Sequence, residues 1–361
     1  MQRILNYGSF LQAYGLKKIL EELGCQVEFV DYHPGKCLIE TPERIGMQRT
    51  FYKVIEVLGY RASIKDKFRF IKYKKGYAKK NFPLLGVKED KKNYFPKLDV
   101  LVIGSDEVFN CVQGNTNVGY SRELFGYGSN AIKTVTYAAS FGNTTFEKIK
   151  EYHIIENVKE DICKLDNLSV RDRNSQNIIK KLTGNIPLIC PDPVLLYDWK
   201  KCIVVNRKVK NKYMVIYGYS GRFSNEECRQ IKEFAKKRKL EIISIGGIQE
   251  IKNSFVDCSP FEVFSYFSNA EYVVTDTFHG VILSIVTKKK FVVFVRNQIE
   301  YGNAQKIEDL LERLGIQSRK LISPLDLENQ ILQDIDYFEL EKNYLEKWRE
   351  DGYEYLTNIF R

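Results

Sequence analysis

The chain has 361 residues, too many for one typical domain and enough for two, and its 44% hydrophobic content excludes an intrinsically disordered protein. The formal net charge of +10 suits phosphates, carboxylates, nucleic acids or anionic membrane surfaces, and charge alone does not choose among them. No hydrophobic run reaches the ~18 residues of a membrane span, and the first residues hold no signal-peptide core.

The eight cysteines are scattered along the chain, and no two of them form a Cys-x-x-Cys pair. The common spacings of zinc sites are therefore missing, and no metal is expected. Single cysteines at this density are typical of reduced core thiols, so the sequence predicts a cytoplasmic protein.

The N-terminal elements follow the strand, turn and helix order of α/β proteins. Apolar residues at helical spacing predict a helix over residues 16–23, Gly24 ends it, and residues 27–32 are predicted to form a strand. A helix that opens after Tyr7-Gly8-Ser9 should itself follow a strand, and almost nothing precedes it. We therefore expect the first strand of this unit to be missing from the sequence.

Four short apolar segments, each ending in a polar turn, predict further strands of a parallel sheet. They cover residues 98–104, 134–138, 168–170 and 186–190. Between Arg61 and Lys80 the chain is basic and aromatic. This stretch is either a solvated helix face or a surface that docks an anionic or membrane-bound acceptor.

A second α/β unit is predicted to begin near Tyr213. Strands are expected at residues 214–217, 241–245, 272–275 and 291–295, and helices at 279–287 and 307–314. Two capping boxes, Ser224 with Glu227 and Ser259 with Glu262, mark further helix starts. The boundary between the units is expected within residues 198–211, and residues 337–361 form an amphipathic helical tail.

The sharpest local feature is the segment Val273–Gly280, in which an apolar strand ends at Asp276 and a helix begins near Thr277. His279 then lies in the first helical turn, at the carboxyl edge of the sheet, where open α/β sheets bind ligands. A histidine at this place binds an anion or transfers a proton. The alternative is a structural role, in which it only packs against the helix or caps it.

Three other strand ends and turns carry polar groups. Gly104-Ser105-Asp106-Glu107 offers Asp106 as either a helix cap or a general base. Arg171 and Arg173 are either bidentate anion ligands or surface ion-pair partners. Asn6-Tyr7-Gly8 opens a helix whose N–H groups could cradle an anion. A dinucleotide-binding GxGxxG fingerprint is absent.

Taken in order, these segments resemble the polysaccharide pyruvyl transferase family. No single segment is decisive, but the ordered set is fairly specific and spans residue 6 to about 315. The matching segments are Asn6–Gly8 with Leu11–Ala13, Gly104–Asn110, Tyr137–Gly142, Ser169–Asp172, Pro191–Pro193 and Thr275–Gly280.

The resemblance implies two Rossmann-like domains in a GT-B-like arrangement with the site in the cleft between them. We expect these domains at residues 1–200 and 211–335, followed by the tail at 336–361. The resemblance also implies phosphoenolpyruvate as the donor, a saccharide acceptor, lipid-linked or polymeric, and a pyruvate ketal as the product. No cofactor and no nucleic acid are expected.

Family members with an Arg-Leu-His triplet use it at the donor site, and Thr277, Phe278 and His279 stand at those positions here. The histidine carries over and the arginine does not, so Arg171, Arg173 or Arg296 is expected to supply the missing cation. The resulting predictions name His279 and Asp106 as catalytic acid and base. They place Arg171, Arg173, Thr277, Phe278 and Gly280 at the donor, and Asn6, Tyr7, Gly8, Ser105 and Glu107 along the acceptor side or the cleft.

Two other interpretations stay open. The same cleft and helix ends would suit a GT-B glycosyltransferase with a nucleotide-sugar donor. The lost arginine also fits a catalytically inactive member that serves as a binding or scaffold protein. Localisation at the cytoplasmic face of an anionic membrane is a further expectation.

Overall fold

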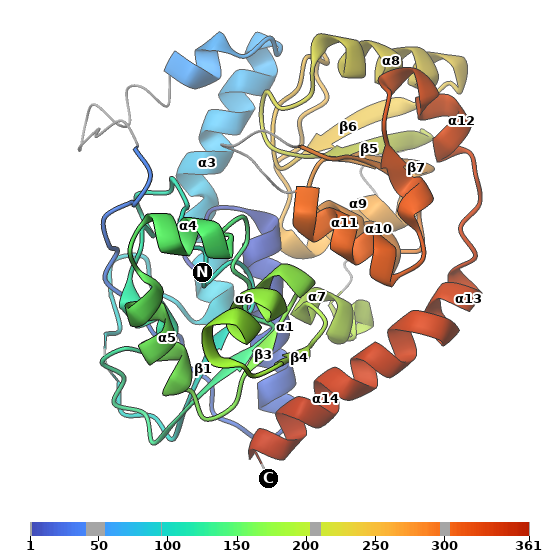
Figure 1. The fold of residues 1–361 in the computed structure, drawn as a ribbon. Coiled ribbons are helices and arrows are strands. Elements are labelled where there is room, and N and C mark those ends of the chain that lie inside the picture. The colour runs from blue at the N-terminus through green and yellow to red at the C-terminus, as the bar shows by residue number, and fades with distance from the viewer. Residues whose placement is uncertain (1, 41–54, 95, 203–210, 297–303, 361) are drawn as a thin grey trace.

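The computed structural model describes residues 2–40, 55–94, 96–202, 211–296 and 304–360, and it consists of two α/β units (Figure 1). In the first unit β1 (Val100–Gly104) pairs in parallel with β2 (Lys133–Tyr137), and β3 (Ser169–Val170) pairs in parallel with β4 (Leu188–Ile189). Two isolated parallel bridges, Val135 to Asn167 and Ala139 to Val170, join the pairs, so the order is β1-β2-β3-β4.

The second unit has a five-stranded parallel sheet in the order β6-β5-β7-β8-β9. Its strands are β5 (Tyr213–Tyr217), β6 (Glu241–Ile245), β7 (Tyr272–Thr275), β8 (Lys290–Phe294) and β9 (Lys320–Leu321). Since β6 and β7 lie on opposite sides of β5, the chain first adds a strand on one side of β5 and then adds all later strands on the other side. Open α/β sheets bind ligands beyond the carboxyl ends of strands at such a switch point.

Helices cover both sheets. In the first unit they are α1 (Tyr7–Glu22), α3 (Ile64–Leu85), α4 (Phe146–Glu151), α5 (Ile155–Cys163), α6 (Arg173–Thr183) and α7 (Pro193–Leu196). In the second unit they are α8 (Asn225–Lys237), α9 (Pro260–Asn269), α10 (Phe278–Val286), α11 (Ala304–Arg313) and α12 (Leu327–Ile331). Both predicted capping boxes are formed, at the starts of α8 and α9. The predicted α/β class with two Rossmann-like units in a GT-B-like arrangement is confirmed.

The predicted strand at residues 27–32 is wrong, because this segment belongs to no strand. It is held instead by scattered bonds: the Asp31 N–H donates to the Asn93 carbonyl at 2.7 Å, and the Gln2 side chain donates to the Val30 carbonyl at 2.9 Å. A strand needs a neighbour that supplies a ladder of hydrogen bonds, and no described strand lies beside this segment.

The basic stretch forms α3, which is more than a solvated helix. Its inner face packs aromatic rings such as Tyr73 and Tyr77 into the core. The carboxylate of Asp66 accepts the N–H groups of Ser254 at 3.2 Å and Phe255 at 3.3 Å, both in the second unit. Helix α3 therefore contacts both units while its other face stays in solvent.

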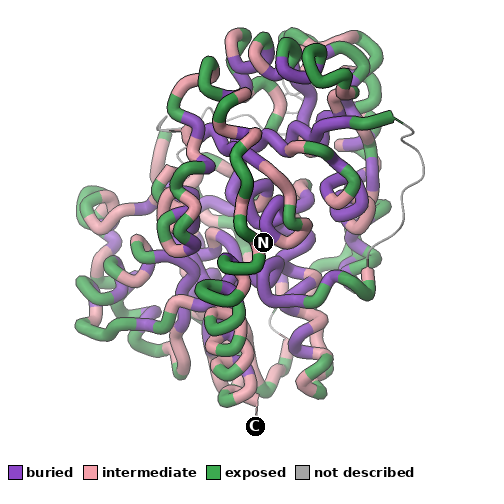
Figure 2. The backbone as a smooth tube through the Cα atoms, turned by 90° about the vertical axis from the view of Figure 1, so that its right-hand side faces the viewer, coloured by how far each residue is buried: buried purple, intermediate pink, exposed green. Residues whose placement is uncertain are grey.

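The C-terminal tail packs back onto the first unit. It consists of α13 (Tyr337–Leu340), a π-helical turn (Glu341–Leu345) and α14 (Glu346–Phe360), which run along the molecule in Figure 1. The Trp348 indole donates to the Ile189 carbonyl, and the Tyr355 hydroxyl donates to the Thr136 carbonyl, both at 2.9 Å. The largest hydrophobic cluster includes residues of both units and of the tail. Figure 2 shows buried segments in both the upper and the lower part of the molecule.

Candidate functional site

The first turns of α1 and α10, from different units, meet at His279. A Cβ atom placed on Gly8 would lie 2.3 Å from Nδ1 of His279, so glycine is what permits this approach. The side chain of Asn6 accepts the Ser9 N–H at 2.7 Å and caps α1, and the Thr277 hydroxyl accepts the Gly280 N–H at 2.9 Å and caps α10. Two positively polarised helix ends therefore converge on one histidine.

Arg171 follows β3 and is 3% exposed. Its Nη1 donates to Oδ2 of Asp192 at 2.8 Å and lies 3.6 Å from Oδ1 of Asp106, while its guanidinium carbon lies 4.4 Å from the centroid of the Phe278 ring. Its Nε and Nη2 have no hydrogen-bond partner among the described residues. A buried guanidinium with unsatisfied donors is costly unless a ligand supplies acceptors, so this geometry favours an anion.

His279 shares a carboxylate with Arg171. Its Nε2 lies 3.5 Å from Oδ2 of Asp192, a distance suited to an ion pair but too long for a good hydrogen bond. The other oxygen of Asp192 accepts the Val194 N–H at 2.9 Å at the start of α7. Burial raises the pKa of Asp192, but the charges of His279 and Arg171 outweigh it and lower that pKa below its usual range. Asp192 is therefore ionised, and it holds Arg171 and His279 at one carboxylate.

Asp106 lies at the end of β1 with a φ of 65°, in the left-handed region that aspartate tolerates better than most residues. Its Oδ2 accepts the Ser9 hydroxyl at 2.8 Å. Burial favours the neutral form of this carboxyl, yet the charges of Arg171, His279 and Lys306 lower its pKa to about 2. Asp106 is therefore fully ionised at neutral pH.

His279, Arg171, Asp192 and Asp106 form one group of charged side chains, the His279 cluster. Most of the other predicted site residues surround it, and their polar groups are already engaged. Tyr7 donates its hydroxyl to the Cys258 carbonyl at 2.8 Å, and Ser105 donates to the Ala138 carbonyl at 2.8 Å. Glu107 forms an ion pair with Lys306 of α11. A Cβ on Gly280 would lie 1.9 Å from the Thr275 hydroxyl oxygen, so this glycine permits tight packing of α10 on β7.

Two of the three candidate arginines lie outside the cluster. Arg173 is half-exposed and pairs with α11, with Nη1 2.8 Å from Glu312 and Nε 3.4 Å from Asp309. Arg296 binds the Glu227 carboxylate through two nitrogens at 2.7 and 3.0 Å, with Asp276 3.4 Å from its Nε. In the part of the chain that the structure describes, Arg171 is the one of the three that shares a carboxylate with His279.

The sequence interpretation gave no role to Ser9, Asp192 or Lys306. Asp192 stands in the matched Pro-Asp-Pro segment, and the structure shows that it caps α7. Its contact with His279 joins two residues that are 87 positions apart in the chain, and local sequence patterns carry no information on such contacts. Lys306 looks like any other basic residue on an amphipathic helix.

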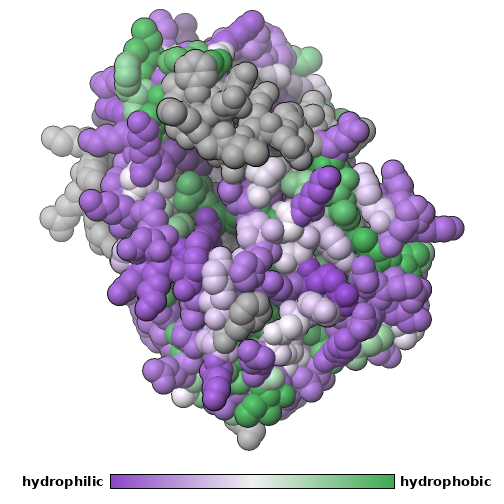
Figure 3. All heavy atoms as spheres, turned by 90° about the vertical axis from the view of Figure 1, so that its left-hand side faces the viewer, coloured by the Kyte–Doolittle hydropathy of each residue, from purple (hydrophilic) through white to green (hydrophobic). Residues whose placement is uncertain are grey.

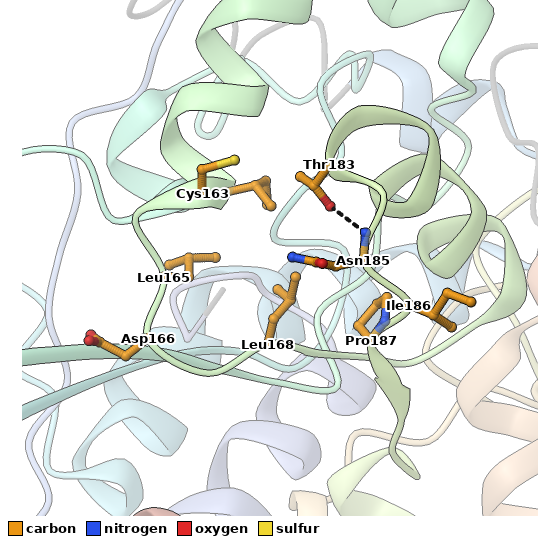
Figure 4. A pocket seen from close by; sticks show the side chains of 9 residues that line it. Cys163, Leu165, Asp166, Leu168, Thr183, Asn185, Ile186 and Pro187 are labelled. Carbon is orange, nitrogen blue, oxygen red and sulfur yellow. Dashed lines mark hydrogen bonds between the residues drawn. The ribbon is translucent and has the colours of Figure 1, made fainter.

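The pocket in Figure 4 lies elsewhere in the first unit. Its lining residues come from the end of α5, the residues before β3, and the loop that joins α6 to β4. This is the amino edge of β3 and β4, opposite the strand ends that carry Arg171 and Asp192. No residue of the His279 cluster lines this pocket, and we assign no function to it.

Comparison with known proteins adds one informative match. The family model described as polysaccharide pyruvyl transferase matches residues 6–298. No curated protein is a significant match to the chain. Among the solved structures, a putative UDP-N-acetylglucosamine 2-epimerase from Listeria monocytogenes is 9% identical, with 77% of this chain and 80% of that one covered and a TM-score of 0.43.

Two further structures are similar at the same remote level. A UDP-forming trehalose-phosphate synthase from Burkholderia xenovorans is 8% identical, with 63% of this chain and 68% of that one covered and a TM-score of 0.38. The glycotransferase of kitacinnamycin is 10% identical, with coverages of 78% and 77% and a TM-score of 0.41. All three scores lie below 0.5, so we draw no functional argument from them.

Proposed function

Since this chain belongs to the polysaccharide pyruvyl transferase family, we propose that it transfers a pyruvyl group from phosphoenolpyruvate to two hydroxyls of a sugar, forming a ketal. The acceptor is a polysaccharide or its lipid-linked precursor, and the reaction takes place on the cytoplasmic side of the membrane. The observation that carries the proposal is the buried Arg171: its Nε and Nη2 are unsatisfied among the described residues, and its Nη1 pairs with the Asp192 carboxylate that also lies beside His279.

Phosphoenolpyruvate suits this cluster because it brings a phosphate and a carboxylate. Arg171 would bind one of these groups through its unused donors, in the forked geometry that matches paired oxygens. The N-terminal ends of α1 and α10 would favour negative charge at the same place. In this proposal Arg171 binds the donor in place of the arginine that other family members have at the position of Thr277. Thr277 itself caps α10.

The proposed reaction has four steps whose atoms balance. His279 gives a proton to the methylene carbon, which becomes a methyl group, and the adjacent carbon becomes cationic. One sugar hydroxyl attacks that carbon and loses its proton to a base, for which Asp106 is the candidate. Phosphate then leaves with the bonding electron pair. A second hydroxyl attacks, gives its proton to the His279 imidazole that was deprotonated in the first step, and closes the ketal ring.

Calorimetry with the donor alone tests the proposal without knowledge of the acceptor. Phosphoenolpyruvate is titrated into the wild type, Arg171→Lys and the matched variant Arg173→Lys, after circular dichroism has shown that all three are folded. Loss of charge-assisted bonds worth about 1.5–3 kcal/mol predicts roughly tenfold to hundredfold weaker binding for Arg171→Lys. Arg173→Lys should bind as the wild type does, because its partners are on α11.

The same titration separates the competing functions. A nucleotide sugar that binds the wild type while phosphoenolpyruvate does not would establish the glycosyltransferase interpretation. Binding of neither donor would favour an inactive family member. Equal affinity of Arg171→Lys and wild type for phosphoenolpyruvate would remove Arg171 from the donor site.

A further inference from the structure

The outward face of α3 combines positive charge with exposed apolar side chains. Ile64, Phe68, Lys72, Lys75 and Lys79 follow one another at spacings of three or four residues, so they form one stripe along the helix. Ile64 is 74% exposed and Phe68 is 69% exposed. We call this stripe, together with the neighbouring Lys65 and Arg69, the α3 face.

Among the described residues, the α3 face carries charge of a single sign. Helix α3 contains eight basic residues and one acid, Asp66, which is buried and occupied by backbone N–H groups of the second unit. Lys80 pairs with Asp257, whereas Lys65 and Arg69 form no ion pair with any described residue. A helix face that only confers solubility usually mixes both signs of charge, and this one carries a single sign.

The apolar part of the surface extends beyond α3. Residues 55–59 are helical, and within them Ile55 is 46% and Leu58 is 56% exposed. The Lys67 ammonium donates to the Leu58 carbonyl, which places this short helix beside the first turns of α3. Figure 3, which views the molecule from the left-hand side of Figure 1, shows hydrophobic side chains exposed beside hydrophilic ones near its top, and α3 begins at the top of the molecule in Figure 1.

We propose that the α3 face docks the protein on a lipid surface that carries anionic headgroups. Basic side chains gain about 1 kcal/mol each near such a surface, a roughly fivefold effect on binding, and apolar residues add to this by entering the headgroup boundary. No described helix is long and apolar enough to cross a bilayer, so this contact is peripheral. A soluble polyanion would use the charges of the α3 face and leave Ile64 and Phe68 without a role.

The consequence for catalysis rests on the proposed function: docking would bring the His279 cluster to a lipid-linked acceptor. The docking itself requires neither donor nor turnover. Loss of vesicle binding and loss of phosphoenolpyruvate binding are therefore independent results, and each proposal can fail alone.

Vesicle co-sedimentation tests the docking proposal with the full chain. Wild type should bind vesicles of phosphatidylcholine with a third phosphatidylglycerol, bind pure phosphatidylcholine far less, and be released by 0.5 M salt, at which a Debye length of roughly 4 Å screens the charges. The triple variant Lys65→Gln, Arg69→Gln, Lys72→Gln should bind roughly a hundredfold more weakly. The pair Ile64→Ser, Phe68→Ser should lose roughly tenfold.

Matched substitutions elsewhere provide the controls. Lys232→Gln, Lys236→Gln and Lys239→Gln remove three charges from the region of α8, and Ile322→Ser with Phe338→Ser removes two apolar side chains that are 88% and 72% exposed. Both controls should bind as the wild type does. The proposal is overturned if wild type ignores anionic vesicles, or if α3 and control variants weaken equally. It is also overturned if a soluble nucleic acid competes fully for a site that does not need Ile64 and Phe68.

Discussion

The positive charges around Asp106 lower its pKa further than suits a general base in the ligand-free protein. A base works best with a pKa near the operating pH, and Arg171, His279 and Lys306 lower the pKa of Asp106 to about 2. A bound anionic donor would offset these cations and raise that pKa again. We therefore expect Asp106 to accept a proton only after the donor has bound.

Asp106→Asn separates this role from donor binding. Removal of one negative charge beside Arg171 should leave the affinity for phosphoenolpyruvate unchanged or tighter, because a competitor for the guanidinium is lost. Transfer of labelled pyruvyl to the glycan fraction should fall by roughly a hundredfold or more. Near-normal transfer by a folded Asp106→Asn protein would leave Asp106 as a structural partner of Ser9 and Arg171.

Asp276 gives a separate prediction about pH and stability. Burial raises its pKa from 3.8 to about 6, although Arg222 and Arg296 oppose the shift. A carboxyl with a raised folded-state pKa keeps its proton in the folded protein after the unfolded chain has lost it. Stability therefore declines as pH rises from about 4 to about 6, by up to about 3 kcal/mol at 1.36 kcal/mol per pH unit.

Urea unfolding of the wild type and Asp276→Asn at pH 4, 5 and 7 measures this effect. The free energy of unfolding of the wild type, minus that of the variant, should be larger at pH 4 than at pH 7 by up to about 3 kcal/mol. The exposed Asp90→Asn serves as the control and should show no such trend. A difference that does not vary with pH would mean that the neighbouring arginines keep Asp276 ionised throughout.

At the scale of elements, the contact between the first turns of α1 and α10 depends on Gly8. Alanine favours helix more than glycine does, so Gly8→Ala alone would strengthen α1. Its methyl group would nevertheless overlap the His279 imidazole, since a Cβ there lies 2.3 Å from Nδ1. We expect Gly8→Ala to remain folded while the imidazole moves and pyruvyl transfer falls at least tenfold.

Gly76→Ala is the matched control for Gly8→Ala. It also replaces a helical glycine, and its Cβ would meet only the Lys80 side chain at an ordinary 3.5 Å. This variant should keep full transfer and gain roughly 0.5–1 kcal/mol of stability. Full transfer by Gly8→Ala as well would show that the position of His279 is not critical.

Strands and helix starts could be predicted where residues close together in the sequence determine them. Apolar runs located the strands, and Ser-x-x-Glu patterns located the starts of α8 and α9, because both signals act over a few residues. Residues 27–32 have a strand-like composition but no adjacent ladder, which composition cannot reveal. Their places at strand ends made His279 and Arg171 candidates, and the structure brings both to the carboxylate of Asp192. The sequence did not point to Asp192, because this contact forms only in the folded chain.

At the scale of the whole molecule, the two units share one hydrophobic cluster and are crossed by one tail. Trp199, in the segment after α7, stacks on Phe264 of α9 in the second unit with ring centroids 4.6 Å apart. The Trp348 indole ties α14 to β4 of the first unit. The sequence has only these two tryptophans, so fluorescence reports both contacts while circular dichroism reports the helices of both units.

We therefore expect thermal unfolding in one cooperative transition, with the same midpoint by fluorescence and by far-ultraviolet circular dichroism. Leu356 of α14 is fully buried, so Leu356→Ala should lower the free energy of unfolding by about 2–5 kcal/mol and shift both signals together. Leu325 is 67% exposed, and Leu325→Ala should change stability by no more than about 0.5 kcal/mol. Two separate transitions in the wild type would contradict a shared core, because units that unfold independently cannot hold His279 and Arg171 against the same carboxylate through the transition.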